Sequence, residues 1–262
     1  MRGLPHGLPG GEGGVLTTPA GISWLDLTLE PVEANLAADE ALLIEADEGR
    51  AGAAVRVWES PTFAVVLGAS RRRAEEVHLD RCEADAVPVL RRSSGGGTVL
   101  IGPGALNVTV VLPSDAAPGL ATVEGAQGYV MGRLAGALSA PGRPVRVLGS
   151  GDLTVDGRKV AGSAQRRLRS WFLVHASILY QFDLGRIDRY LKVPLRQPAY
   201  REGRSHADFL SNLDRPRRIL EASIRAAWMI PPSQASATDV PHDLLESLLS
   251  ERFSNRSWIE RF

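Results

Sequence analysis

The stretch of this chain best suited to bind a ligand is RRSSGGGTVL, which runs from Arg91 to Leu100. It follows an apolar run at 86–90, so we expect a strand that ends in a loop with few obstructing side chains. Because glycine has no Cβ, the glycines at 95–97 can adopt positive φ and let backbone N–H groups approach an anionic or planar ligand. Arg91 and Arg92 are expected to add positive charge at the mouth of the loop. A flexible hairpin is the alternative interpretation of three glycines.

A second candidate is the lysine beyond a tight turn in the sequence GDLTVDGRK, residues 151–159. The Asp-Gly pair in it is the strongest short hairpin signal in the chain, and a hairpin would hold Lys159 rigidly beside a ligand. The alternative is a solvated lysine at the end of a strand. Three small residues follow it and leave room for a large group beside the ammonium: Gly162, Ser163 and Ala164.

His175 is the remaining candidate, and it lies inside the apolar run Ser170–Tyr180, where histidine is commonly a satisfied core residue. The five histidines show no HxH or HxxxH spacing, so no zinc site is expected. No serine occupies a GxSxG motif, which leaves a hydrolase triad without its nucleophile. The glycine loop matches neither GxGxxG nor a P-loop sequence.

Composition narrows the classes of partner. Thirty basic and thirty acidic residues balance among 262, so neither nucleic acid nor an anionic membrane is an expected partner. The chain length suits one main domain. The single cysteine, Cys82, excludes an internal disulfide and a cysteine-based metal cluster, which fits a reducing, cytoplasmic compartment. No apolar run approaches the roughly 20 residues of a membrane span, and the first residues lack the apolar core of a signal peptide.

Periodicity predicts an α+β fold with a mixed, largely antiparallel β-sheet flanked by helices. The glycine- and proline-rich residues 1–20 are expected to be a disordered tail. The turn at 59–61 joins the second and third predicted strands, and the glycine loop is expected to form a β-loop-β unit with the strand 107–112. Predicted strands are Ile22–Leu29, Ala54–Trp58, Thr62–Leu67, Asn107–Leu112, Leu153–Val155 and Ser170–Tyr180. One predicted helix begins at Pro31. The other predicted helices span Arg71–Ala86, Val123–Leu138, Gly185–Tyr190, Pro216–Met229 and His242–Phe253.

Three motifs carry a family resemblance by their order in the chain. They are RRSSGGGTV at 91–99, GDLTVDGRKVAGSAQRR at 151–167 and VHASILYQFDL at 174–184. Together they resemble the lipoate–protein ligase family, whose fold is shared with biotin protein ligases. The similarity covers roughly Ile22 to Leu213. It implies a biotin/lipoate protein ligase-like catalytic domain at 21–230 and a short C-terminal helical tail at 231–262.

The resemblance implies ATP-dependent activation of lipoate or octanoate to an acyl-adenylate. The acyl group would then pass to a lysine on the lipoyl carrier domain of a 2-oxoacid dehydrogenase or glycine cleavage protein. Lys159 would be catalytic, contacting the acyl carboxylate and the phosphate. His175 would flank the acyl tunnel, which the apolar strands would wall. The residues that would line the lipoyl and adenylate site are Arg91, Ser94, Gly95, Gly96, Gly97, Gly162, Ser163 and Ala164. Asn107 and Asp152 would lie near the nucleotide and its Mg²⁺, with Asp152 as the magnesium ligand.

Departures from the family pattern bear on activity. Leu100–Gly102 stand where members often show an HD or HG pair, and Ala176 stands where glycine is usual, so its methyl group is expected to reshape the tunnel. The chain extends only shortly beyond Phe253, where some ligases carry an accessory domain, so an accessory subunit is an expected partner.

Three other functions are alternatives to the lipoate–protein ligase. An octanoyl- or lipoyl-transferase would act through an acyl-cysteine and needs a thiolate beside the lysine. Phe172 and the stretch 145–151 occupy the places where such a cysteine is expected, which leaves only Cys82. A biotin ligase matches the lysine hairpin and GSAQRR less well. A non-catalytic lipoyl-binding homologue is the third alternative.

Overall fold

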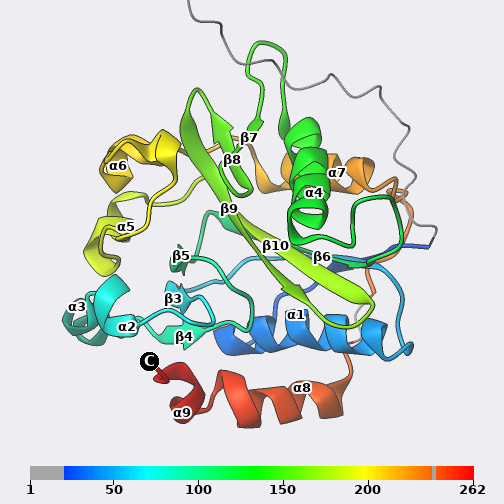
Figure 1. The fold of residues 1–262 in the computed structure, drawn as a ribbon, viewed down its shortest axis with the longest axis horizontal. Coiled ribbons are helices and arrows are strands. Elements are labelled where there is room, and N and C mark those ends of the chain that lie inside the picture. Colours follow the sequence, from blue (N-terminus) through cyan, green and yellow to red (C-terminus); the bar gives the residue numbers. More distant parts are fainter. Residues whose placement is uncertain (1–20, 238–239) are drawn as a thin grey trace, which may run out of the picture.

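The structure is a computed structural model that describes residues 21–237 and 240–262 (Figure 1). The predicted disordered tail at 1–20 lies outside these residues. The described chain forms a mixed, largely antiparallel sheet flanked by helices, which confirms the predicted α+β class. Within the same residues, no helix is long and apolar enough to cross a membrane.

The larger sheet of the described chain has seven strands in the order β1-β2-β6-β10-β9-β8-β7. β1 and β2 are parallel, and the other neighbouring pairs are antiparallel. The long central strands, β6 and β10, come from runs that combine β-branched and aromatic residues with other apolar ones. The strands are β1 (Ser23–Asp26), β2 (Ala54–Trp58), β6 (Ala105–Pro113), β7 (Arg146–Leu148), β8 (Asp152–Val155), β9 (Arg158–Arg167) and β10 (Trp171–Leu179).

The smaller sheet holds the glycine loop. Its central strand β3 (Ala64–Leu67) pairs in parallel with β4 (Val89–Arg91) and antiparallel with β5 (Val99–Ile101). The loop therefore runs from β4 to β5 past the end of β3. The expected β-loop-β unit with 107–112 is wrong, because β6 belongs to the larger sheet.

The turn at 59–61 separates the two sheets. The predicted strands on either side of it, β2 and β3, both form, but β2 lies in the larger sheet and β3 in the smaller one. Glu59 explains the divergence: its Oε1 accepts from the Gly104 N–H at 2.7 Å and its Oε2 from the Tyr180 hydroxyl at 2.9 Å. These bonds fix the turn where the chain leaves β2.

Helices cover both faces of the larger sheet (Figure 1). α4 and α7 pack together on one face, and α1 packs against β6 and β10 on the other, with α8 outside it. Because Val77 pairs with Leu191 in an isolated bridge, the helix expected at 71–86 divides into α2 and α3. The helices are α1 (Val32–Asp47), α2 (Arg73–Glu76), α3 (Leu79–Ala84), α4 (Val123–Leu138), α5 (Gly185–Tyr190), η1 (Ala199–Arg201), α6 (His206–Phe209), α7 (Arg217–Ala227), α8 (His242–Leu248), η2 (Leu249–Phe253) and α9 (Arg256–Ile259). β7, η1, α6 and α9 have no counterpart among the predicted elements.

The central strands present different chemistry on their two faces, since successive side chains point to opposite sides. Val108, Val110 and the other apolar positions pack into the core beneath α4. Ala176 belongs to the same core, so its methyl group lies on the face of β10 opposite to His175. The alternate positions are polar and face α1 and the smaller sheet: Asn107, Thr109, His175 and Ser177.

Candidate active site

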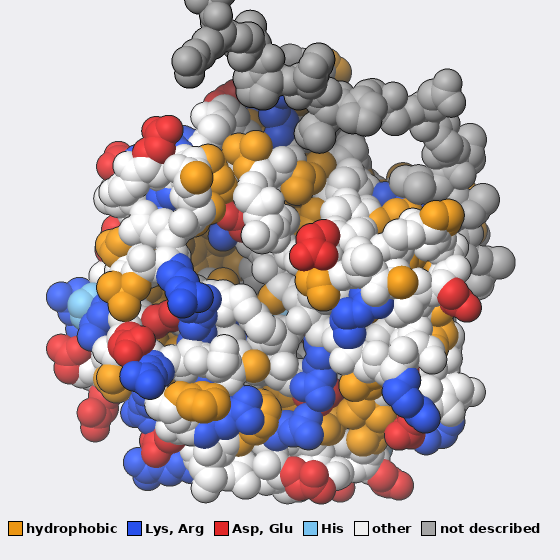
Figure 2. All heavy atoms as spheres, in the orientation of Figure 1, with side chains coloured by type: hydrophobic (Ala, Val, Ile, Leu, Met, Phe, Trp, Pro, Cys, Tyr) orange, Lys and Arg blue, Asp and Glu red, His pale blue; other side chains and the backbone are white. Residues whose placement is uncertain are grey.

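A cleft lies between this polar face and the smaller sheet, and it consists of two adjoining chambers. The inner chamber has a volume of about 110 Å³ and the outer chamber about 250 Å³. Figure 2 shows the surface hollowed between the region of α5 and α6 and that of β8 and β9, with basic side chains around the hollow. The residues that line both chambers mark their junction: Gly97, Thr98, Val99, Lys159, Gly162 and Ser177.

A row of residues crosses the floor of the inner chamber perpendicular to the strands. Gly162 on β9 lies opposite Ser177, which lies opposite Asn107, which in turn lies opposite Trp58 on β2. The Ser177 hydroxyl donates to Asn107 Oδ1 at 2.7 Å. The floor therefore carries polar groups along this row, whereas Leu36 of α1 and the roof from the smaller sheet supply apolar walls. Roof residues are Val66, Val99 and Ile101.

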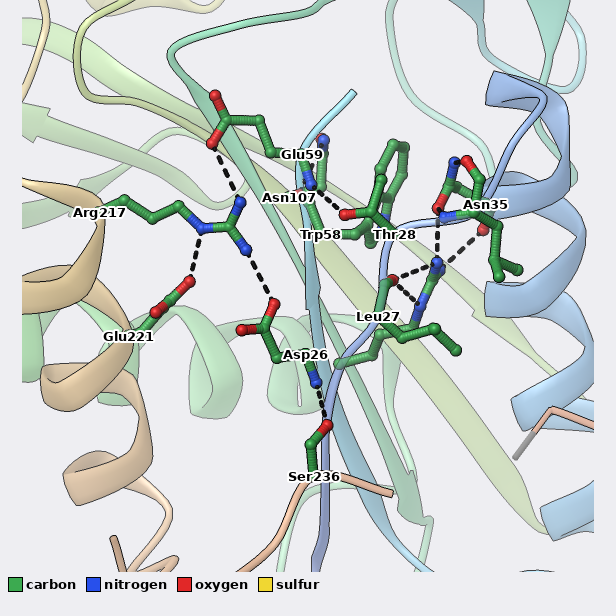
Figure 3. A network of polar contacts seen from close by, with 12 residues as sticks. Asp26, Leu27, Thr28, Asn35, Trp58, Glu59, Asn107, Arg217, Glu221 and Ser236 are labelled. Atoms are coloured by element: carbon green, nitrogen blue, oxygen red, sulfur yellow. Dashed lines mark hydrogen bonds and ion pairs between the residues drawn. The ribbon is translucent and has the colours of Figure 1, made fainter. Parts of the chain in front are cut away.

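A buried ion pair supports the side of this chamber. Arg56 Nη1 lies 2.6 Å from Asp39 Oδ1, and both side chains are at most 5% exposed. The guanidinium also donates to the Leu27 carbonyl and to Asn35 Oδ1 (Figure 3). Burial acts to raise the pKa of Asp39, but the charge of Arg56 and the neighbouring His175 side chain overcome it and leave that pKa below its usual value. Asp39 is therefore a carboxylate.

His175 connects the carboxylate to the glycine loop. Its Nε2 lies 2.7 Å from Ser94 Oγ and its Nδ1 lies 3.8 Å from Asp39 Oδ2. Burial lowers the pKa of His175, with Asp39 opposing, so the imidazole is neutral. The order of groups is that of a hydrolase triad, but Ser94 is 2% exposed and accepts from Arg92 Nε at 2.9 Å. The array therefore orients the imidazole that lines the chamber; it does not present a serine nucleophile.

Arginines hold the glycine loop by its carbonyl oxygens. Arg92 Nη2 donates to Gly95 and Gly97, at 2.5 and 2.8 Å, and Arg71 Nε donates to Gly96 at 2.9 Å. Because the C=O and the following N–H of a peptide point in opposite directions, the N–H groups of 96–98 point away from these guanidiniums. Gly96 has φ +88° and a Cβ there would lie 3.0 Å from Arg92 Nη2, so the position requires glycine.

The expectation that Arg91 and Arg92 charge the mouth of the loop is wrong. Arg92 is buried within the loop, and burial lowers its pKa to about 10. Arg91 is 0% exposed and turns away from the cleft, donating to the carbonyls of Gly68, Arg71 and Ile259. Arg91 therefore fastens β4 to the C-terminal segment and is not brought to the cleft.

Lys159 reaches the junction of the chambers from the predicted hairpin. The turn residues Asp156 and Gly157 have φ of 51° and 72°, as a two-residue type I′ turn requires. A Cβ added to Gly162 would lie 2.8 Å from Lys159 Nζ, which places the ammonium directly over that glycine. Lys159 Nζ also lies 2.9 Å from Asp152 Oδ1.

Tyr200 completes the support of the lysine. Its hydroxyl donates to Asp152 Oδ2 at 2.7 Å, so Asp152 bridges the hairpin and η1. Burial and the neighbouring carboxylate raise the pKa of Tyr200, so the phenol stays protonated and remains a donor. Lys159 is thus a positive charge with a fixed position.

The outer chamber is cationic. Arg71, Lys192, Arg196 and Arg201 line it, together with Glu76, which pairs with Arg71 at 3.2 Å. Arg201 is 3% exposed, and its Nη2 has no hydrogen-bond partner within the described residues. Because four cationic side chains surround one space, this chamber suits an anionic ligand with several oxygens.

The structure brings most of the predicted site residues to one cleft. Those lining a chamber are Gly97, Asn107, Lys159, Gly162, Ser163, Ala164 and His175. Gly95 and Gly96 lie on the adjacent exposed loop, Ser94 behind His175, and Asp152 beside Lys159. Asn107 and Asp152 are not brought together, because β10 and β9 lie between their strands.

Asp152 was also the predicted magnesium ligand. Among the described residues, no group of three or more His, Cys, Asp or Glu side chains could hold a metal. Both Asp152 oxygens have partners, Lys159 and Tyr200. Since Mg²⁺ usually binds through one or two carboxylates and the phosphates of a substrate, Asp152 fits as a single protein ligand only.

Several lining residues were not predicted from the sequence: Asp39, Trp58, Thr109, Ser177 and Arg201. Tyr200, which supports Lys159 through Asp152, was not predicted either. A signal existed for Thr109 and Ser177, because polar residues at every second position of an apolar strand mark one polar face. Asp39 stands among alanines and leucines in NLAADEALL, where an acid facing a core requires a partner. Tyr200 and Arg201 lie in the short helix η1, whose sequence shows no recognisable pattern.

Comparison with known sequences finds one matching family and related enzymes of two kinds. The family "Lipoyl protein ligase A/B catalytic domain" matches residues 31–222. A probable lipoate-protein ligase A of Mycoplasma pneumoniae is 28% identical over 179 residues, which cover 68% of this chain and 49% of that protein. The octanoyltransferase LipM of Carboxydothermus hydrogenoformans is 29% identical over 263 residues, covering 87% and 94%. The chain thus spans about half the length of the first relative.

Two solved structures share the fold. A lipoate-protein ligase A bound with ATP superimposes with a TM-score of 0.77 at 22% identity, covering 91% of this chain and 98% of the other. The bi-partite lipoate protein ligase of Thermoplasma acidophilum, described with its E2 lipoyl domain, gives 0.75 at 21% identity, covering 92% and 96%. The lipoate ligase-like fold expected from the sequence is confirmed.

Proposed function

The chain belongs to the lipoyl protein ligase A/B catalytic domain family, and from this premise we propose that it is an ATP-dependent lipoate–protein ligase. In the proposed reaction, ATP activates lipoate or octanoate to an acyl-adenylate. The acyl group then passes to a lysine of a lipoyl carrier domain.

The observation that carries this function is the position of Lys159 at the junction of the cationic outer chamber and the inner chamber. In the first step, a carboxylate oxygen bonds to the α-phosphorus and the bond to pyrophosphate breaks. Two anions must meet, and charge grows on the leaving group. A fixed ammonium between the chambers would stabilise that charge without reorganising.

Each chamber suits one substrate. The outer chamber offers phosphate oxygens four cationic side chains, Arg201 among them. The inner chamber extends away from Lys159 across β10 and β6 to Trp58, and would hold the acyl chain under its apolar roof. Magnesium arriving with ATP would neutralise phosphate charge, and we propose Asp152 as the carboxylate that would hold it.

The second step requires a carrier domain. Its lysine amine would bond to the acyl carbonyl carbon as the bond to AMP breaks, and the amine proton would pass to solvent. We propose the lipoyl domain of a 2-oxoacid dehydrogenase or glycine cleavage protein as this partner. The bi-partite Thermoplasma ligase supports an accessory subunit as a second partner.

Octanoyl transfer is the alternative function, and the similarity to the octanoyltransferase LipM supports it. It needs a thiolate acyl carrier, and the sequence has one cysteine, Cys82. Cys82 is 2% exposed in an apolar cluster on α3. Burial, with Asp80 and Asp85, raises the pKa of Cys82 to about 11, so it stays a thiol at neutral pH. This favours the ligase.

The decisive experiment supplies the protein with ATP, Mg²⁺, lipoate and a purified lipoyl domain, and follows the carrier by mass spectrometry. We expect an ATP-dependent mass increase of one lipoyl group, accompanied by pyrophosphate release. ATP-independent acylation from an octanoyl carrier protein would identify a transferase. Lipoate binding without either reaction would identify a non-catalytic homologue.

Replacing Cys82 separates the ligase from the transferase in a single variant. Cys82→Ala should leave carrier acylation close to the wild-type rate, because the thiol only packs against its neighbours. The measurement is the acylation rate beside the thermal melt. Lost activity with an unchanged melt, together with a trapped thioester in the wild type, would establish the transferase.

Displacing the ammonium tests its position without removing its charge. Gly162→Ala would place a methyl carbon 2.8 Å from Lys159 Nζ, so the flexible side chain must move. We expect adenylate formation to fall about ten- to hundredfold, since small misplacements of catalytic groups are costly. Gly136→Ala on α4 is the matched control, because nothing lies within 4 Å of its added Cβ. Equal rates for both variants would contradict the assigned position.

A further inference from the structure

A histidine–carboxylate pair that the proposed reaction does not yet use lies at the outer chamber. His206, at the start of α6, is 6% exposed and lines this chamber. Its Nδ1 lies 2.6 Å from Oδ1 of Asp188 on α5, whose side chain is half exposed and is not among the lining residues. Its Nε2 has no hydrogen-bond partner among the described residues and is not one of their polar atoms closed to solvent. The imidazole therefore turns Nδ1 to the carboxylate and leaves Nε2 open to the chamber.

Backbone contacts hold α6 beside the hairpin that carries Lys159. The Leu210 N–H donates to the His206 carbonyl at 2.9 Å, which closes one helical turn. Leu210 also pairs with Lys159 in an isolated parallel bridge, and the next residue, Ser211, donates its N–H to the Lys159 carbonyl at 2.9 Å. His206 and Lys159 thus reach one chamber from two segments whose register is fixed.

The surroundings of His206 leave its imidazole as a base. Burial lowers the pKa of His206, and the positive charges of Arg201 on η1 and Lys159 on β9 act in the same direction. Asp188 on α5 opposes them, but the pKa stays below its usual value, so the imidazole is neutral at physiological pH. With the Nδ1 proton donated to Asp188, the free lone pair lies on Nε2.

We infer that His206 Nε2 accepts the proton of the carrier lysine in the acyl-transfer step. This rests on the proposed function, which places the bond between the acyl group and AMP beside Lys159. The amine nitrogen bonds to the acyl carbonyl carbon and becomes positively charged, and it loses one proton as the bond to AMP breaks. Nε2 takes that proton, Asp188 stabilises the imidazolium, and the proton then passes to solvent. The products are the amide, AMP and one proton.

The test measures the two steps separately. The first step is followed by pyrophosphate release from ATP and lipoate, and the second by mass spectrometry of a lipoyl domain mixed with chemically synthesised lipoyl-adenylate. His206→Asn keeps an N–H near the position of Nδ1 but has no basic nitrogen. We expect it to slow transfer about a hundredfold, the lower end of general base catalysis, and to leave pyrophosphate release within about threefold of the wild type.

The control is a second histidine–carboxylate pair. His242 lies 3.6 Å from Glu246, but its side chain is 78% exposed and lines neither chamber, so His242→Asn should leave both steps unchanged. Unchanged transfer by folded His206→Asn would overturn the inference. An equal loss in both steps would also overturn it, since His206 would then be a contact for the nucleotide.

A second variant tests the inference should His206→Asn fail to fold. Asp188 raises the pKa of His206, so Asp188→Asn should slow transfer severalfold and move its loss on acidification to lower pH. The transfer rate is measured from about pH 5 to about pH 8 and divided by the fraction of neutral lysine amine. An acidic limb at the same pH as in the wild type would contradict the role of His206.

Synthetic adenylate also separates this inference from the proposed function. Transfer that depends on His206, by a protein that releases no pyrophosphate from ATP, would support the role of His206 and contradict the ligase function. Pyrophosphate release with transfer that does not depend on His206 would support the ligase and overturn the inference.

Discussion

Lys159→Ala should lower acyl-adenylate formation about a hundredfold, or roughly 3 kcal/mol, as for other preorganised charges at a transition state. Stability should change little. The Lys159 side chain is 24% exposed, and its ion-pair partner Asp152 would keep the hydrogen bond from Tyr200. The measurement is pyrophosphate release by the variant beside its thermal melt.

Two further substitutions sharpen this result. Lys159→Arg should also be slow, because a planar guanidinium is wider than an ammonium and the space over Gly162 is narrow. Arg256→Ala is the matched control, since it removes a cation that lines neither chamber and whose side chain, paired with Glu260, is 87% exposed. Near wild-type adenylation by Lys159→Ala would show that the residue has no part in the mechanism. A strongly lowered melting temperature would show that its role is structural.

Local signals in the sequence located the lysine well. The Asp-Gly pair specifies a two-residue turn by its own conformational preferences, and the hairpin β8–β9 formed where expected. The helices α4 and α5 also begin and end as predicted. Each of these features depends on residues close together in the chain.

Features that depend on distant contacts could not be predicted. Arg91 precedes the glycines and looks like a ligand contact, but its Nε donates to Ile259, a residue 168 positions away. Whether an arginine faces solvent or a carbonyl depends on which segment packs beside it. Asp39 and Arg56 likewise lie on different elements, α1 and β2. The sequence around either residue does not predict that its charged side chain is buried beside the other.

This Asp39–Arg56 pair should dominate the stability of the cleft. Arg56→Ala is expected to lower the free energy of unfolding by about 3–5 kcal/mol, because it leaves Asp39 buried without a counter-charge. The measurement is denaturant unfolding followed by tryptophan fluorescence. Arg72→Ala is the control: its pair with Glu75 is 68% and 49% exposed, and such pairs contribute little.

The pH dependence of this loss identifies its cause. In the wild type, the folded pKa of Asp39 lies below its unfolded value of about 3.9, so its contribution is present above that pH and lost on further acidification. Without Arg56, burial would raise the pKa of Asp39, and stability would instead fall as pH rises above the unfolded value. The deficit of Arg56→Ala should therefore shrink from about pH 8 to about pH 5. A deficit independent of pH would show that the lost packing of the arginine, and not the stranded carboxylate, destabilises the variant.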